Sequence, residues 1–226
     1  MRLKDKVAIV TGGGSGFGAG IVRKFVAEGA QVLVADLNLE GALEVATSVG
    51  PAARALRVDV SVAADVRTMM EAAELHFGRL DILVNNAGIG HLPQPLEALP
   101  EEQFDRLFAV NMKAIYLAMR EAVPRFKAAN NGQGRGVVLN MASTAGVSPR
   151  PRLAWYNASK GWVITATRAS AVELAPFGIR VNALNPVAGE TPLLATFMGE
   201  DTPAMRAKFL STIPLGRFST PEDLGN

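Results

Sequence analysis

The sequence predicts an α/β protein in which helices cover both faces of a parallel β-sheet. Short apolar runs rich in β-branched residues alternate with longer stretches of helical periodicity along most of the chain. A glycine-rich turn separates the first such run from the first helical stretch. Strands that alternate with helices form βαβ units, which build parallel sheets with helices on both sides. The chain has 226 residues, 49% of them hydrophobic, so it can bury one sizeable core, and we expect a single domain over residues 1–226.

The first half of the chain is expected to contain four strands and three helices. Glycines that follow the helical stretches are typical helix ends, and Ser61 is predicted to cap the third helix. The predicted strands cover 7–10, 31–36, 55–60 and 80–84, and the predicted helices cover 19–28, 39–49 and 61–77.

The second half begins with a loop over 89–100, which contains three prolines. A long helix is predicted over 101–127, with Pro124 as a candidate kink, and an exposed turn over 130–134. The remaining predicted elements are a strand over 136–141, an irregular segment over 142–152, a helix over 153–175 and a strand over 179–185.

Composition excludes several classes of function. The formal net charge is +2 and the basic residues are scattered, which argues against nucleic acid as a partner. The chain has no cysteine, so it forms no disulfide, thiolate metal site or cysteine nucleophile, and we expect a cytoplasmic protein. The N-terminus leads directly into the first strand, so no signal peptide is expected. The sequence contains no run of about 18 apolar residues, so no membrane span is expected.

The turn between the first strand and the first helix predicts a phosphate-binding loop. Glycines at Gly12, Gly16 and Gly18 follow the spacing G-x-x-x-G-x-G. Glycine allows backbone N–H groups to approach an anion closely, and a helix N-terminus adds partial positive charge. A plain tight turn remains the alternative at this point.

Asp36 ends the second predicted strand, 20 positions after Gly16. An acidic residue at about this spacing accepts hydrogen bonds from an adenosine ribose and repels the additional phosphate of NADP. No basic residue follows at 37–39, and Ser15 is not basic. We therefore expect NAD rather than NADP, with a turn-forming role for Asp36 as the alternative.

The next two strand ends carry weaker signals. Val60 is placed to contact an adenine ring, and Asp59 either accepts from the adenine amino group or caps the following helix. The sequence Asn-Asn-Ala-Gly at 85–88 ends the fourth strand and is, by itself, an ordinary turn sequence.

Tyr156 and Lys160 are four positions apart on a predicted helix, so their side chains share one face. An ammonium group near a phenol lowers the pKa of the phenol, which then transfers a proton to or from a substrate oxygen more readily. On spacing alone, an incidental Tyr/Lys pair on a helix surface is the favoured interpretation.

Ser143 follows the fifth strand, and its hydroxyl is placed to polarise a carbonyl oxygen, with a cap or turn role as the more common alternative for a loop serine. Asn111 lies within the long predicted helix, where asparagine is a poor helix former, so it is a candidate to bind a buried water or a backbone carbonyl, with a satisfied core asparagine as the alternative. A serine hydrolase is not favoured, because no G-x-S-x-G turn is present and, of the two histidines His76 and His91, His76 lies in a helix far from the strand ends.

Together, these motifs resemble the short-chain dehydrogenase/reductase family. The resemblance covers almost the whole chain and rests on the motifs at 11–18, Asp36, 85–88, Asn111, Ser143 and Tyr156-x-x-x-Lys160. It implies a Rossmann-like fold, a nicotinamide dinucleotide cofactor and hydride transfer at an alcohol or carbonyl carbon. It further implies that Tyr156 is the general acid/base, that Lys160 lowers its pKa and holds the nicotinamide ribose, that Ser143 orients the substrate oxygen and that Asn111 anchors a proton-relay water.

The resemblance also assigns a cofactor-binding set, with three departures from the family pattern. Ala142 stands where many members have a second serine, and Val187 replaces a common glycine. The chain stops as a helix begins near residue 221, so a C-terminal seventh strand is expected to be missing. The expected cofactor contacts are Gly12, Ser15, Gly16, Phe17, Gly18, Asp36, Asp59, Val60, Asn86, Ala87, Gly88, Tyr156, Lys160, Pro186, Val187 and Thr191.

A substrate lid is predicted over about 189–214, where apolar residues recur at helical spacing. Val147, Trp155 and part of this lid are expected to face the substrate, and His91 is a candidate for the rim. An apolar pocket favours a secondary alcohol or ketone. The alternatives are an NADPH-dependent 3-oxoacyl-carrier-protein reductase and a non-catalytic nucleotide sensor. The resemblance also implies a homodimer or homotetramer.

Overall fold

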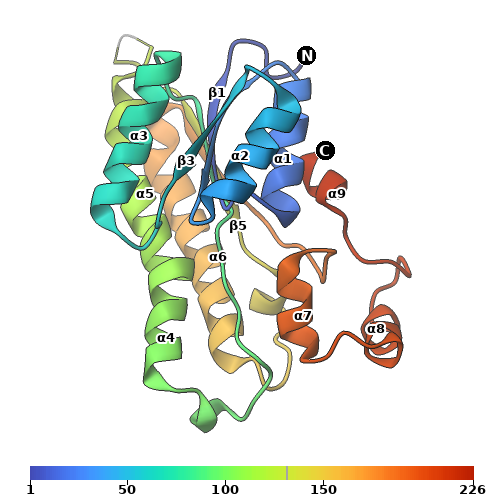
Figure 1. Cartoon of the computed structure of the whole chain (residues 1–226). Helices are drawn as coiled ribbons and strands as arrows, with labels where there is room; N and C mark the ends of the chain where they lie inside the picture. The colour runs from blue at the N-terminus through green and yellow to red at the C-terminus, as the bar shows by residue number, and fades with distance from the viewer. Residues whose placement is uncertain (131) are drawn as a thin grey trace.

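The computed structural model describes residues 1–130 and 132–226, and it has the predicted α/β architecture (Figure 1). Six parallel strands form one sheet in the order β3-β2-β1-β4-β5-β6. The strands are β1 (Val7–Thr11), β2 (Gln31–Asp36), β3 (Ala53–Arg57), β4 (Ile82–Asn85), β5 (Gly136–Met141) and β6 (Ile179–Leu184). The α-helices are α1 (Gly16–Ala27), α2 (Leu39–Val49), α3 (Ala63–Phe77), α4 (Glu101–Phe108), α5 (Ala114–Ala128), α6 (Ala154–Leu174), α7 (Pro192–Met198), α8 (Pro203–Leu210) and α9 (Pro221–Gly225).

Helices cover both faces of the sheet, and each face has its own core. Alternate residues of a strand point to opposite sides, so Ile9 packs with α3 and α5 whereas Val10 packs with α1 and α2. Large buried side chains such as Met69 and Phe126 fill the first core. Burial on both sides explains why β1 and β2 are nearly continuous apolar runs. A single doubly wound domain is thus confirmed.

The order of the strands reverses at β1, which pairs with β2 on one side and with β4 on the other. Connections leave in opposite directions at such a point, and a crevice opens beyond the carboxyl ends of the strands. The glycine-rich turn after β1 and the Asn-Asn-Ala-Gly turn after β4 both lie at this edge.

Several element boundaries differ from the prediction. β3 ends at Arg57 rather than at residue 60, and α3 begins at Ala63 with Val62 as the N-cap residue. The predicted capping role of Ser61 is wrong, because its backbone N–H and hydroxyl both donate to Asp59. The strand over 136–141 and the helix over 39–49 are confirmed at both ends.

The long helix predicted over 101–127 is interrupted by one π-helical turn, Ala109–Lys113, between α4 and α5. Short 3₁₀ turns also occur within the predicted loop at Leu96–Ala98 and within the irregular segment at Thr144–Gly146. The turn predicted over 130–134 includes residue 131, which lies outside the described residues.

The segment after β6 folds back over the crevice. Helices α7 and α8 share a small apolar cluster that includes Leu194, Met198 and Ile213. Helix α9 then packs against α1, which brings the C-terminal segment beside the first helix (Figure 1). A Cβ on Gly20 would collide with the Pro221 backbone, so the close approach of these helices requires glycine.

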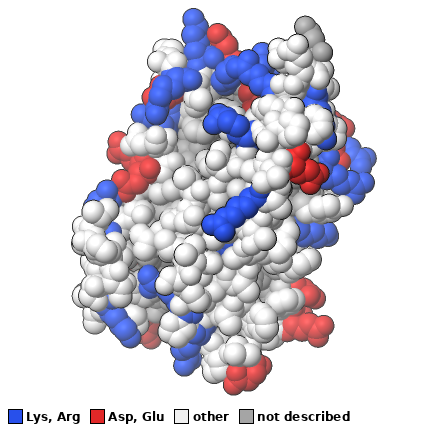
Figure 2. Space-filling view, turned by 180° about the vertical axis from the view of Figure 1, so that it is seen from behind, with Lys and Arg blue, Asp and Glu red and all other residues white. Residues whose placement is uncertain are grey.

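In the part of the chain that the structure describes, no helix is both long and apolar enough to cross a bilayer. Charged side chains of both signs are scattered over the face seen in Figure 2, with broad uncharged areas between them.

Candidate active site

A cavity of about 640 Å³ lies at the carboxyl ends of the central strands and beneath α7. It brings together residues from motifs more than 170 positions apart, which no single segment of the chain could do. The predicted site residues that line it are Gly12, Ser15, Gly16, Phe17, Asp36, Asp59, Val60, Asn86, Ala87, Gly88, Ser143, Tyr156, Lys160, Pro186, Val187 and Thr191. Gly18 and Asn111 are absent from the cavity wall and support it from behind.

The glycine-rich loop is shaped as a cradle for an anion. Gly12 and Gly16 have φ angles of 62° and 50°, in the region that favours glycine. A Cβ on Gly12 would lie 3.0 Å from the Ala87 Cα. The first turn of α1 contributes backbone N–H groups that have no partner within the helix. The cradle therefore has both the room and the donors for a pyrophosphate.

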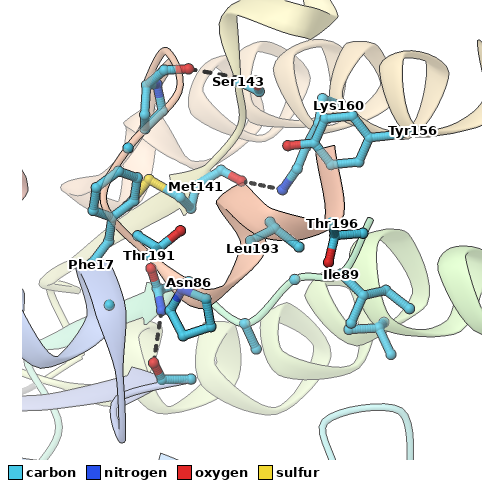
Figure 3. Close-up of a pocket in the computed structure, with 18 of the residues that line it drawn as sticks. Phe17, Asn86, Ile89, Met141, Ser143, Tyr156, Lys160, Thr191, Leu193 and Thr196 are labelled. Atoms are coloured by element: carbon cyan, nitrogen blue, oxygen red, sulfur yellow. Dashed lines mark hydrogen bonds between the residues drawn. The ribbon is translucent and has the colours of Figure 1, made fainter. Parts of the chain in front are cut away.

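Asn86 joins this loop to the end of β4. Its side-chain amide donates to the carbonyl oxygens of Thr11 and Gly12, at 2.9 Å and 3.0 Å. The Thr11 hydroxyl in turn accepts the backbone N–H groups of Asn86 and Ala87. These bonds hold the two strand ends in one register and fix the floor of the cavity, as Figure 3 shows for Asn86.

Asp36 faces the cavity from the end of β2. One carboxylate oxygen accepts the Gly14 N–H at 2.9 Å, and the other accepts the Asn38 N–H at 2.9 Å. The carboxylate thus braces the glycine-rich loop and also forms the turn that opens α2.

Asp59 lies further along the same wall. Its carboxylate accepts from the Ser61 backbone and hydroxyl, and these hydrogen bonds lower its pKa. Asp59 therefore closes the turn that precedes α3. It does not cap the helix itself, because the N-cap residue of α3 is Val62.

Tyr156 and Lys160 face the other end of the cavity from α6, and both are buried (Figure 3). The Lys160 Nζ donates to the Met141 carbonyl at 2.8 Å and lies 5.9 Å from the centre of the Tyr156 ring. Burial lowers the pKa of Lys160 to about 8.

Burial raises the pKa of Tyr156 to about 12, although its contact with the Ser143 hydroxyl acts in the opposite direction. The expected lowering of this pKa by Lys160 is not seen in the structure, because the ammonium is held by Met141.

Ser143 precedes the short 3₁₀ turn after β5. Its hydroxyl accepts the Ala145 N–H at 3.1 Å and lies 3.5 Å from the Pro186 carbonyl oxygen (Figure 3). The first of these bonds is the turn-capping role typical of a loop serine. The same hydroxyl also faces the cavity beside Tyr156.

Asn111 sits in the π-helical turn and is 1% exposed. Its side chain forms two hydrogen bonds with the backbone of Ile89, accepting the N–H and donating to the C=O, each at 2.9 Å. It also donates to the Ser159 hydroxyl at 3.1 Å. Asn111 therefore ties the loop after β4 to α6, and the expected hydrogen bond to a backbone carbonyl is present.

The apolar end of the cavity comes from the lid. Leu193, Phe197 and Phe209 line it, and the Phe197 ring centre lies 4.7 Å from that of Tyr156. The other predicted apolar residues of the lid, Leu194 apart, pack away from the cavity: Met198, Met205 and Leu210 belong to the cluster shared by α7 and α8.

Three residues expected at the substrate do not line the cavity. Val147 is 70% exposed, and Trp155 donates from its ring N–H to the Leu96 carbonyl. His91 is buried and bonded to the Leu92 carbonyl, so its predicted position on the rim is wrong.

Sequence reasoning missed two cations of the cavity wall. Arg106 lies near Asp59, whose pKa it helps to lower, and Arg150 lies on the loop between β5 and α6. The signal for Arg150 was its place between Ser143 and Tyr156, in a loop that starts and ends at catalytic candidates. Residues 1–130 and 132–226 contain no group of three or more acidic or histidine side chains that could hold a metal ion.

Comparison with known proteins agrees with this geometry. A family model described as short chain dehydrogenase matches residues 6–201. The chain is 50% identical over 230 residues to 4-formylbenzenesulfonate dehydrogenase of Comamonas testosteroni, covering 100% of this chain and 90% of the relative. It is 37% identical over 231 residues to galactitol 2-dehydrogenase of Agrobacterium fabrum, covering 99% and 89%.

Among solved structures, the chain is similar to a 3-ketoacyl-(acyl-carrier-protein) reductase from Brucella melitensis complexed with NADH. The TM-score is 0.93 and the identity 51%, with 99% of this chain and 88% of the other covered. The predicted resemblance is thereby confirmed, and this chain belongs to the short-chain dehydrogenase family.

Proposed function

We propose that this chain is an NAD-linked oxidoreductase that interconverts a secondary alcohol and a ketone, with Tyr156 as the general acid/base. One observation carries the proposal. A single cavity has a glycine cradle and Asp36 at one end, and Tyr156, Lys160 and Ser143 at the other. A cofactor that spans this cavity would have its phosphates at the first end and its reacting ring at the second.

The class of reaction is supported by the relatives. Two of them are dehydrogenases by name, and the similar solved structure contains NADH. This chain is accordingly an oxidoreductase that acts on CH–OH groups with NAD(H).

When bound, NAD accepts or donates the hydride, and the residues of the chain supply position and a proton. Gly12, Gly16 and the first turn of α1 would hold the pyrophosphate. Asp36 would accept from the adenosine ribose, and a carboxylate at this position disfavours the additional phosphate of NADP. Val60 would contact the adenine ring, and Pro186, Val187 and Thr191 would contact the nicotinamide end.

The proton would move at the Tyr156 hydroxyl. In alcohol oxidation this oxygen takes the hydroxyl proton of the substrate, and in ketone reduction it returns one. The Ser143 hydroxyl would donate to the substrate oxygen and hold it beside the phenol. The pKa of Lys160 is about 8, so the side chain is cationic at neutral pH. Movement of its Nζ from the Met141 carbonyl toward the phenol would favour the phenolate. Asn111 would fix the backbone around Ile89, where a relay water is expected.

The two alternatives are less favoured. A 3-oxoacyl-carrier-protein reductase that requires NADPH conflicts with the carboxylate of Asp36 at the ribose position. A non-catalytic nucleotide sensor would not need Ser143, Tyr156 and Lys160 assembled beside an apolar pocket.

We further propose that the chain works in the cytoplasm as a homodimer or homotetramer. Exposed large apolar side chains on α4, α5 and α6 support assembly: Phe104, Phe108, Tyr116, Trp162 and Val172. Light scattering in solution tests the assembly, and the mass of a monomer would contradict it.

The function is tested by initial rates of NADH formation across a panel of secondary alcohols, with NAD and NADP compared at equal concentration. We expect turnover of at least one apolar secondary alcohol and a marked preference for NAD. A preference for NADP would overturn the role of Asp36, and no turnover of any alcohol in the panel would favour the nucleotide sensor.

A further inference from the structure

Charge is distributed unevenly along the cavity. Asp36, Asp59 and Arg106 lie toward the proposed adenosine end. Lys160 donates a hydrogen bond to the Met141 carbonyl. Arg150 is the remaining charged residue of the cavity wall among the described residues, and it lies with the apolar residues of the substrate end.

The backbone of Arg150 is held in place by a buried side chain. The Asn157 amide, which is 7% exposed, donates to the Arg150 carbonyl at 2.7 Å. Asn157 is on the first turns of α6, next to Tyr156, so the loop that carries Arg150 is anchored to the same helix as the acid/base residue. The backbone position of Arg150 relative to Tyr156 is thus fixed by a direct hydrogen bond.

The guanidinium of Arg150 lies against the lid, with its central carbon 5.2 Å from the centre of the Phe209 ring. It forms no ion pair with any carboxylate in residues 1–130 and 132–226. A cation–π contact with an aromatic ring helps to hold the guanidinium while leaving its N–H donors available for a ligand.

We propose that Arg150 binds an anionic group of the substrate, which makes the substrate an alcohol or ketone with a carboxylate or sulfonate remote from the reacting carbon. This proposal rests on the function proposed above and names the substrate class of that site. Leu153, Leu193 and Phe197 line the cavity with Arg150 and Tyr156, and they favour an apolar, preferably aromatic, body between the two polar ends. A guanidinium pairs with two oxygens of a carboxylate or sulfonate at once, so it orients the substrate as well as attracting it.

The experiment compares two substrates of nearly the same shape, the anionic 4-(1-hydroxyethyl)benzoate and the neutral 4-(1-hydroxyethyl)benzamide, with NAD. Wild type is expected to prefer the benzoate in kcat/KM by about 10- to 100-fold, as for one charge-assisted hydrogen-bonded pair. Arg150→Met should remove this preference mainly through KM and leave the benzamide within about twofold of wild type. Arg150→Lys should restore part of it, because a lysine keeps the charge and loses the bidentate geometry.

Arg152→Met is the matched control. Arg152 is two positions away on the same loop, does not line the cavity and donates only a long bond to the Pro93 carbonyl. The control should keep the preference for the benzoate. An equal loss in Arg150→Met and Arg152→Met would overturn the proposal, because it would show an effect of general charge.

A binding measurement separates this proposal from the proposed function. Titration of the protein–NAD complex with 4-acetylbenzoate or 4-acetylbenzamide requires no turnover. Tighter binding of the acetylbenzoate that is lost in Arg150→Met supports the anion site, whether or not either alcohol is oxidised. Failure to oxidise both alcohols would count against the proposed catalytic function and not against the anion site. Equal or undetectable binding of the two ketones to wild type would overturn the anion site.

Discussion

Burial acts in opposite directions on Tyr156 and Lys160. A buried phenol resists ionisation, so the pKa of Tyr156 rises to about 12, whereas a buried amine resists protonation, so the pKa of Lys160 falls to about 8. Both shifts disfavour the charged form of the side chain. Burying these two groups therefore costs stability, as is common for ionisable groups in active sites.

The lowered pKa of Lys160 predicts that the stability of the protein depends on pH. An unfolded lysine titrates near 10.5, so between pH 8 and pH 10.5 the unfolded chain binds more protons than the native protein, and stability rises with pH across this window. Below pH 8 the full penalty is present, about 3 kcal/mol at 1.4 kcal/mol per pKa unit. Lys160→Met should raise the free energy of unfolding at pH 7 by about 2 kcal/mol, after about 1 kcal/mol is deducted for the lost bond to Met141.

Urea denaturation at pH 7 and pH 10 measures this effect, and the advantage of Lys160→Met should shrink at the higher pH. Lys113→Met, which changes an exposed lysine of the π-helical turn, is the control and should show no such trend. If Lys160→Met were less stable than wild type at both values, the buried amine would not carry the penalty assigned to it.

At the scale of elements, the packing of α1 on the end of β1 depends on Gly18. A Cβ at this position would collide with the Gly12 carbonyl oxygen and lie 2.6 Å from the Asn86 side-chain nitrogen. Gly18→Ala should therefore push α1 away from the loop, cost about 1–3 kcal/mol of stability and weaken NAD binding. Thermal denaturation and titration with NAD measure the two effects.

Gly161→Ala is the matched control, since Gly161 is also helical and its Cβ would meet only the Gly146 oxygen, at an ordinary 3.6 Å. Alanine is the better helix former by up to about 1 kcal/mol, so this variant should be as stable as wild type or more so. Equal behaviour of the two alanine variants would contradict the packing role of Gly18.

The order and type of the main elements were predictable from sequence, because buried strands and amphipathic helices have distinct periods. β5 is an example, with Gly136 at its start and an apolar run that ends at Met141. The π-helical turn at Asn111 was not predictable, because it depends on hydrogen bonds to Ile89 and Ser159, which are remote in sequence. The end of β3 was predicted too far along the chain, because Val58 and Val60 are apolar residues that look like a continuation of the strand. In the structure they contact the cavity and the core and lie beyond the end of the strand.

The residues proposed for cofactor binding and proton transfer could be named from sequence as a set, because each lies just after a strand or on a fixed helical spacing, and most of them line one cavity. The substrate end was less predictable. Val147 and Trp155 are apolar and close to Tyr156 in sequence, but the loop turns Val147 to the surface, and Trp155 packs edge-on against Phe104. Arg150 shows the converse, because only the folded loop places its charge in an apolar pocket.

At the scale of the whole molecule, a ligand that spans the cavity should stabilise the entire domain. The cavity joins the ends of β1, β2, β4 and β5 to the lid, so unfolding would destroy every contact at once. At 100 times its dissociation constant, NAD should add about 2.7 kcal/mol and raise Tm by roughly 5–11 °C for a chain of this size. Differential scanning calorimetry should show a much smaller rise with NADP, and equal rises would contradict the selectivity assigned to Asp36.

The central claim is that Tyr156 transfers the proton while the rest of the cavity holds the cofactor. The chain has two tyrosines, and the other, Tyr116, is 55% exposed on α5, so Tyr116→Phe is a matched control. The most direct measurement is the turnover number of Tyr156→Phe, beside its NAD-induced rise in Tm. The account predicts a loss of about 10²- to 10⁴-fold in turnover with the NAD-induced rise nearly unchanged, and no loss in Tyr116→Phe. Turnover retained in Tyr156→Phe would contradict it.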